Sequence, residues 1–304
     1  MTLKEALKNY KLLVSDGGIG TQLQQLGLEP GGCGDEWNIS HPDRVASVHQ
    51  KYLDAGSQLV TTNTFGSNRF VLSNYGLADR QAEIACTGAK IAKGVMKDNG
   101  WAIGSVGPCG GFLKPLGEID PAELEDSLQA QIAALLEGGA DAILLETLTA
   151  LEEVELSVRV ASRLNAPCVI VTAAFDPTKD GARTMMGVTP EEFARAAVAA
   201  GADVIGANCG TLAGPEAFIQ LAQRLRSAAD VPLMIQPNGG QPVLEGDKIV
   251  YRISPEQMAD TLAEIGKHVN VVGGCCGTAP AHICALSGRI KSSLTAEAAG
   301  KGHC

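Results

Sequence analysis

Short apolar runs and longer amphipathic segments alternate along almost the whole chain. The apolar runs are rich in Val, Ile and Leu, and their length and composition are those of buried strands. They lie at 12–14, 58–62, 102–106, 142–145, 169–172, 203–206, 232–235 and 269–272. A strand that is apolar on both faces must be covered on both faces, so this pattern indicates a parallel sheet with helices on either side.

The segments between these runs carry helix start signals. A proline follows His41, Asp120, Thr189 and Ser254, and predicts helices over 42–55, 121–137, 190–199 and 255–265. Eight strand–helix units favour an α/β fold of the (β/α)₈ TIM-barrel type, as one domain over residues 1–291. A doubly wound open sheet is the alternative arrangement. Residues 292–304 (SSLTAEAAGKGHC) are small and polar, and we expect a flexible C-terminal tail there.

Composition and charge exclude several classes of partner. The 304 residues carry a net charge of −10, whereas nucleic acids and anionic membranes bind positive surfaces. The N-terminus lacks the apolar stretch of a signal peptide, and no run of about 18 apolar residues occurs. These features predict a cytoplasmic protein that binds neither nucleic acid nor membrane. Both a monomer and a homo-oligomer are compatible with the sequence.

Three of the nine cysteines are candidate metal ligands, and each follows a predicted strand. Cys209 comes after the sixth strand, and the adjacent pair Cys275 and Cys276 comes after the eighth, in GGCCGT. Because the loops after the strands build the active face of such a barrel, the three thiols are expected to meet there. Adjacent cysteines form only a strained disulfide, but they can share a metal ion. Three thiolates with a fourth position open would form a catalytic zinc site.

Two other interpretations of these turns remain open. Small cysteines also pack as ordinary core residues at tight turns. The glycine-rich turns PNGG and GGCCG could instead bind phosphate through backbone N–H groups, as in a barrel isomerase or lyase. A Schiff-base aldolase is disfavoured, because no predicted strand ends in a lysine.

Seven motifs resemble those of a known family. DGGIGTQL, TNTFG, SVGPCGGFLKPLGEID, LLETLT, GANCG, PNGGQPV and GGCCGT occur in this order between residues 11 and 290. The chain is therefore similar to the homocysteine S-methyltransferase family, and within it to the homocysteine-binding domain of cobalamin-dependent methionine synthase. The resemblance implies a barrel that holds one zinc ion on Cys209, Cys275 and Cys276 and binds homocysteine as a thiolate for methylation to methionine. Zinc suits this task because it deprotonates a thiol and has no redox chemistry.

The rest of the amino acid needs polar partners. Glu146 after the fourth strand and Asp16 after the first are the carboxylates best placed for the ammonium group, and the matching positions of related proteins serve this role. Gly17 and Gly18 allow the substrate carboxylate to approach backbone N–H groups. Asn63 and Asn208, both at strand ends, could orient polar groups. Asp16 and the asparagines could equally be turn residues.

The methyl donor is inferred by elimination. A quaternary ammonium donor such as betaine needs an aromatic cage, but only 4% of the residues are aromatic. Trp37 could form one wall of a cage or simply pack in the core, and Cys109 lies near the predicted site without an assigned role. The resemblance favours methylcobalamin carried by a separate corrinoid protein. The alternative is a free onium donor: S-methylmethionine, another sulfonium or betaine. A noncatalytic homocysteine-binding module and a selenol acceptor also remain open.

Overall fold

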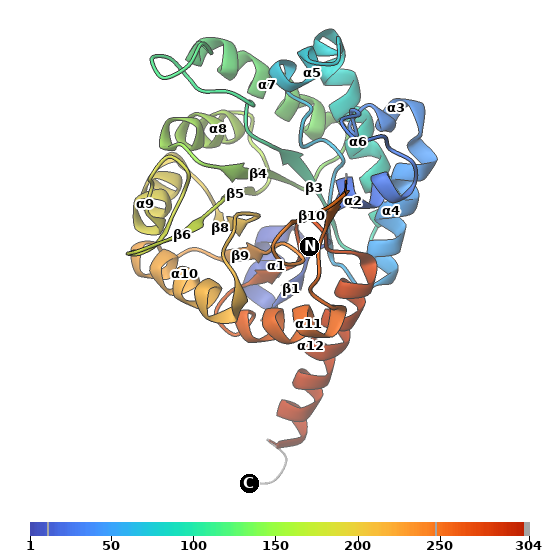
Figure 1. The fold of residues 1–304 in the computed structure, drawn as a ribbon, viewed down its shortest axis with the longest axis vertical. Helices are drawn as coiled ribbons and strands as arrows, with labels where there is room; N and C mark the ends of the chain where they lie inside the picture. The colour runs from blue at the N-terminus through green and yellow to red at the C-terminus, as the bar shows by residue number, and fades with distance from the viewer. Residues whose placement is uncertain (11, 247, 301–304) are drawn as a thin grey trace.

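Eight parallel strands form one sheet in the order β1, β12, β9, β8, β5, β4, β3 and β2 (Figure 1). The computed structural model describes residues 1–10, 12–246 and 248–300. The sheet strands are β1 (Leu13–Val14), β2 (Leu59–Thr61), β3 (Trp101–Val106), β4 (Ala142–Leu148), β5 (Val169–Ala173), β8 (Val204–Asn208), β9 (Leu233–Gln236) and β12 (Val271–Val272). A parallel bridge between Ser15 and Leu59 joins the first strand to the second and closes the ring. The predicted (β/α)₈ barrel is confirmed, and each strand coincides with a predicted run.

Helices surround the barrel. They are α2 (Ile19–Gln25), α3 (Trp37–Ser40), α4 (Pro42–Asp54), α5 (Arg69–Ser73), α6 (Gln81–Met96), α7 (Pro121–Glu137), α8 (Leu151–Arg163), α9 (Pro190–Ala200), α10 (Gly214–Ala228), α11 (Pro255–Ile265) and α12 (Pro280–Gly300), with a 3₁₀ turn at Ala78–Arg80. The four helices predicted from proline positions begin where expected. Thr189 and Ser254 start α9 and α11 through reciprocal capping boxes, which satisfy backbone N–H groups that a helix leaves free.

The N-terminal helix closes one end of the barrel. Leu3, Ala6 and Leu7 of α1 (Leu3–Asn9) are buried in a cluster with side chains from inside the barrel, including Leu13 and Leu59. Figure 1 shows α1 near the centre of the ring of strands. This plug covers the end at which the strands begin, so a cavity is left at the end where they terminate.

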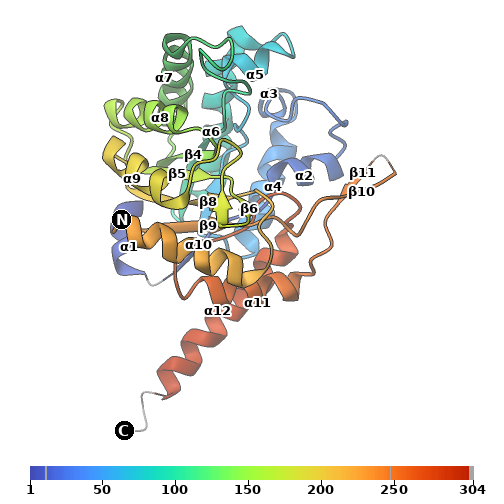
Figure 2. The same cartoon turned by 60° about the vertical axis from the view of Figure 1, so that its left-hand side comes forward.

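Two β-hairpins and a long C-terminal helix are added to the barrel. β6 (Asp176–Thr178) pairs with β7 (Gly181–Arg183), and β10 (Val243–Glu245) pairs with β11 (Lys248–Val250). Figure 2 shows the second hairpin projecting from the barrel and α12 running away from it. Residues 292–300, expected to be a loose tail, have helical backbone, and 301–304 lie outside the described residues. The flexibility of the tail stays a prediction.

Within the described part of the chain, no helix is long and apolar enough to span a membrane.

His49 on α4 is a buried base without a hydrogen-bond partner among the described residues. Burial lowers its pKa to about 4 from 6.5. Because the unfolded chain binds this proton more tightly, stability contributed by neutral His49 is present above pH 6.5 and is lost as the pH falls toward 4, by up to about 3 kcal/mol. We expect His49→Leu to stabilise the fold, and more at about pH 5 than at about pH 7.5.

Chemical denaturation of both proteins at the two pH values measures this effect. The carboxylates that also titrate in this range are common to both proteins, so they cancel in the difference between variant and wild type. An equal difference at both pH values would show that His49 is not the titrating group.

Candidate active site

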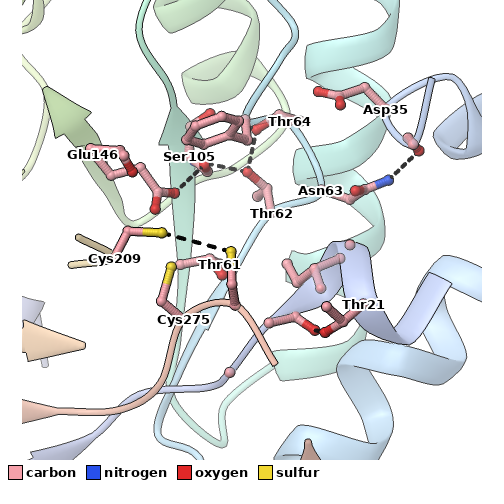
Figure 3. A pocket seen from close by; sticks show the side chains of 18 of the residues that line it. Thr21, Asp35, Thr61, Thr62, Asn63, Thr64, Ser105, Glu146, Cys209 and Cys275 are labelled. Carbon is pink, nitrogen blue, oxygen red and sulfur yellow. Dashed lines mark hydrogen bonds between the residues drawn. The ribbon is translucent and has the colours of Figure 1, made fainter. Parts of the chain in front are cut away.

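The three predicted thiols meet at the open end of the barrel, where Figure 3 shows Cys209 and Cys275 beside each other. Cys209 follows β8, while Cys275 and Cys276 follow β12, and β9 lies between these strands in the sheet. The sulfur atoms all lie within 4.8 Å of one another, and Sγ of Cys209 is 3.7 Å from Sγ of Cys276. Thiols from separate turns are thus brought within reach of one ion, as the strand order predicted.

The backbone at Cys209 has an unusual conformation. Its φ angle is +56°, in the left-handed region that costs a non-glycine residue about 1–3 kcal/mol. Gly210 follows with φ +66°, and a Cβ there would lie 2.3 Å from the carbonyl oxygen of Phe175. The left-handed turn therefore depends on a glycine at 210 and directs the chain sharply away from the strand end.

The three thiols change one another's ionisation. Hydrogen bonds from Cys209 and then Cys275 lower the pKa of Cys276 to about 3. The Cys275 thiol donates to Cys209 and to Cys276, and these hydrogen bonds, together with burial, raise the pKa of Cys275 well above its usual value. One negative charge is therefore shared by the cluster, and ionising all three thiols requires a positive ion between them. Soft thiolates select zinc over harder cations such as magnesium, so the residues fit a zinc ion.

Several backbone N–H groups of the same turns are already used within the protein. Their backbone N–H groups donate to carbonyl oxygens within the chain: Gly239 to Cys276, Gly274 to Asp16, Cys275 to Pro237 and Thr278 to Cys275. A phosphate site in a barrel needs such N–H groups free. The N–H groups of Gly239, Gly274, Cys275 and Thr278 are therefore not free to bind a phosphate.

Glu146 faces the thiols from β4. The pairing of β4 with β5 shifts register between Leu145 and Leu148, and Thr147 has φ +63°. Such an irregularity redirects a side chain beside an active site. Ser105 donates to Oε1 of Glu146 at 2.5 Å. Burial is the main cause that raises the pKa of Glu146 to about 7.

Asn208 holds Glu146 in place from β8. Its amide nitrogen donates to Oε2 of Glu146 at 3.0 Å, and its amide oxygen accepts from the Thr147 N–H at 2.9 Å and the Thr172 hydroxyl at 2.7 Å. The same nitrogen lies 3.8 Å from Sγ of Cys275. Asn208 does not line the cavity, so its position supports orientation of Glu146 rather than direct substrate contact.

Asp16 lies beneath the cavity instead of facing it. Its side chain is fully buried; the Thr61 N–H and hydroxyl donate to Oδ2 at 2.7 and 2.8 Å, and the Ser15 hydroxyl donates to Oδ1 at 3.2 Å. Burial raises the pKa of Asp16 to about 7, against these hydrogen bonds. A direct contact between Asp16 and the substrate ammonium stays a prediction, and the observed role of Asp16 is to anchor β2 beside β1.

A cavity of about 370 Å³ lies between Glu146 and the thiols. Of the residues named from the sequence, it is lined by Gly17, Gly18, Asn63, Glu146 and the three cysteines. It is also lined by Thr61, Thr62, Ser105, Gln236, Asp35 and Phe65. The amide nitrogen of Asn63 donates to the carbonyl of Gly34 at 2.8 Å. This hydrogen bond holds the loop around Gly34, which forms the wall of the cavity opposite the thiols. Figure 3 shows Asn63 and Asp35 on the other side of the view from Glu146 and Cys209.

Several contacts could not be found by sequence reasoning. Ser105 had a weak signal, since it is a polar residue inside an apolar strand. Asp35 accepts hydrogen bonds from the Gly66 N–H and the Ser67 hydroxyl. These contacts join loops that are distant in the sequence, so no local sequence pattern predicts them. Asn238, in the PNGG turn, donates to the carbonyl of Gly210 at 3.0 Å, and its buried amide oxygen has no protein partner among the described residues.

Trp37 and Cys109 contact other residues of the protein and lie outside the cavity. Trp37 is 7% exposed, stacks on His41 with ring centroids 4.5 Å apart and does not line the cavity. The Cys109 thiol donates to the Gly111 carbonyl and also lies outside the cavity. Phe65 is the aromatic residue among the described residues that line the cavity. One ring does not form a cage for a quaternary ammonium group.

Comparison with known proteins identifies the family. The model of the homocysteine S-methyltransferase family matches residues 13–290. The chain belongs to the homocysteine S-methyltransferase family. Methionine synthase of Mycobacterium tuberculosis is 34% identical over 295 residues, and that of Mycobacterium leprae is 34% identical over 293 residues. Each alignment covers 90% of this chain and 24% of the relative, so the chain spans about a quarter of the length of these curated relatives.

The fold of this family member is also found in a solved structure. Homocysteine methyltransferase MmuM from Escherichia coli, in its metallated form, superposes with a TM-score of 0.78 at 21% identity. The superposition covers 94% of this chain and 99% of that chain. At this level of identity the likeness supports the barrel fold.

Proposed function

We propose that this family member is a zinc-dependent methyltransferase that methylates the thiol of homocysteine to form methionine. The observation that carries the proposal is the convergence of Cys209, Cys275 and Cys276, with their sulfur atoms within 4.8 Å of one another at the mouth of a barrel of this family. These three residues would hold one zinc ion per chain and leave a position for the substrate thiol. Zinc in that place supplies a Lewis acid that keeps a thiol deprotonated near neutral pH.

The other residues would bind and orient the amino-acid end of the substrate. Glu146 lines the cavity beside the thiols and would accept a hydrogen bond from the ammonium group, which also favours its ionised form. Asn208 and Ser105 hold both oxygens of this carboxylate, so its orientation is set before substrate binds. The backbone of Gly17 would meet the substrate carboxylate, whereas the Gly18 N–H already donates to Thr278.

We propose that the methyl group is delivered by a corrinoid on a separate protein or domain. The cavity lacks an aromatic cage among its described residues, which disfavours betaine. Large apolar side chains are exposed in the segments between a barrel strand and the next long helix: Phe65, Phe112, Leu116, Met185 and Leu244, the last in β10. Exposed apolar side chains around a catalytic mouth are suited to docking a large carrier. A free sulfonium donor such as S-methylmethionine is the alternative.

A donor assay tests this proposal. Zinc-loaded protein is incubated with homocysteine and, separately, methylcobalamin, S-methylmethionine or betaine, and methionine is quantified. Of the three donors, we expect only methylcobalamin to give methionine. No methionine should form when homocysteine is omitted. Methionine formed from S-methylmethionine or betaine would contradict the corrinoid donor and favour the free onium donor, and methionine from none of the three would contradict the use of a free donor by this chain.

A further inference from the structure

Thr278 joins the turn that carries Cys275 and Cys276 to the turn that carries Gly17 and Gly18. It is fully buried, and its hydroxyl donates to the carbonyl of Cys275 at 2.6 Å. The same hydroxyl oxygen accepts from the Gly18 N–H at 3.0 Å, while the Thr278 carbonyl lies 3.2 Å from that nitrogen. One side chain therefore connects the thiol turn after β12 to the turn after β1.

The two turns pack closely against each other around Thr278. A Cβ on Gly17 would lie 2.5 Å from Oγ1 of Thr278, and a Cβ on Gly18 would lie 2.7 Å from the carbonyl oxygen of Cys275. The Gly274 N–H donates across the same junction to the carbonyl of Asp16 at 2.8 Å. Only glycines permit the turns to approach so closely, and the position of one turn therefore fixes the position of the other.

Tyr52 braces this junction from α4. It is fully buried, and its hydroxyl lies 2.9 Å from the carbonyl oxygen of Thr278 and 3.2 Å from that of Gly18. A hydroxyl has one proton to donate, so Tyr52 shares it between the two turns. Neither Tyr52 nor Thr278 lines the cavity, so both act through the turns that they hold.

We propose that Thr278, braced by Tyr52, sets the spacing between the thiol cluster and the amino-acid end of the cavity, and thereby selects substrate length. The inference rests on the proposed function, in which the substrate sulfur lies at the cysteines while the backbone carboxylate and ammonium lie near Gly17 and Glu146. A ligand held at both ends must match the distance between them. Homocysteine would match it, and cysteine, one methylene shorter, would not reach both ends. Thr278 and Tyr52 are positioning residues in this account.

Thr278→Val tests this role because it removes the hydroxyl and keeps the side-chain volume. The Thr278 N–H still donates to the Cys275 carbonyl at 3.2 Å, and the Gly18 N–H still reaches the carbonyl of residue 278, so the turns keep their backbone bonds. Calorimetry on zinc-loaded protein gives dissociation constants for homocysteine and cysteine. We expect wild type to prefer homocysteine by at least about tenfold. Thr278→Val should reduce that ratio about fivefold, Tyr52→Phe should reduce it in the same direction, and Thr278→Ser should restore it.

Thr184→Val is the matched control. Thr184 is buried, its hydroxyl donates to the Thr149 carbonyl at 2.7 Å and accepts from the Val188 N–H at 3.2 Å, and it lies outside the cavity. This variant should leave the ratio unchanged, and zinc content is measured for every protein. An unchanged ratio in Thr278→Val, with homocysteine still bound selectively by wild type, would overturn this inference alone. Failure of zinc-loaded wild type to bind homocysteine would overturn the proposed function and the inference together.

Discussion

Cys209→Ala is expected to lose zinc binding at the barrel mouth. The substitution removes one of three sulfur ligands, and the two that remain, Cys275 and Cys276, come from a single turn. Loss of an outer-shell partner alone typically costs about 10- to 100-fold in metal affinity, and loss of a ligand should cost more. Elemental analysis after dialysis, and competition with a chromophoric chelator, measure the effect.

Cys284→Ala is the control for the removal of a thiol. Cys284 is exposed on α12, away from the cavity, and its variant should hold as much zinc as wild type. If Cys209→Ala and Cys284→Ala bound zinc equally well, Cys209 would not be a ligand, and the pair after β12 would need other partners.

Glu146→Gln is expected to weaken homocysteine binding while it stabilises the zinc-free protein. A hydrogen bond to a charged group contributes about 1.5–3 kcal/mol, so the loss of the carboxylate charge should raise the dissociation constant for homocysteine about 10- to 100-fold. Burial raises the pKa of Glu146 to about 7 from 4.5, which means that its ionised form is disfavoured in the folded protein. Calorimetry and chemical denaturation measure the two opposed effects.

The pH dependence gives this prediction a direction. Because the folded pKa of Glu146 is raised, its contribution disfavours the fold increasingly as the pH rises from 4.5 to 7, by up to about 3 kcal/mol. The gain in stability of Glu146→Gln over wild type should therefore grow over that range. Glu153→Gln is the matched control: Glu153 is a buried carboxylate with a raised pKa, it accepts from the Cys109 N–H, and it does not line the cavity. This control should gain stability without losing affinity for homocysteine; equal losses of affinity would remove Glu146 from the substrate site.

The barrel and its thiols were predictable because each depends on a strong local signal. Apolar runs marked every strand, proline marked four helices, and a barrel brings residues after its strands to one face. The approach of Cys209 to the pair at 275 and 276 follows from the strand order alone. No chemical detail beyond residue type and strand number was needed.

Other parts of the site arise from contacts between distant segments. The bulge that directs Glu146 depends on how β4 pairs with β5, and the enclosure of Asp16 depends on donors from Thr61. The loop with Asp35 is held by hydrogen bonds to the turn after β2. Such arrangements are set by tertiary pairing, so a carboxylate at a strand end can equally face the cavity or lie beneath it.

The most direct test of the central claim is X-ray absorption at the zinc edge of the purified, reduced protein, before and after addition of homocysteine. The account predicts about one zinc per chain with three sulfur ligands from Cys209, Cys275 and Cys276, and a fourth sulfur when homocysteine is present. Protein that is supplied with zinc yet holds none, or a zinc edge that homocysteine leaves unchanged, would contradict it.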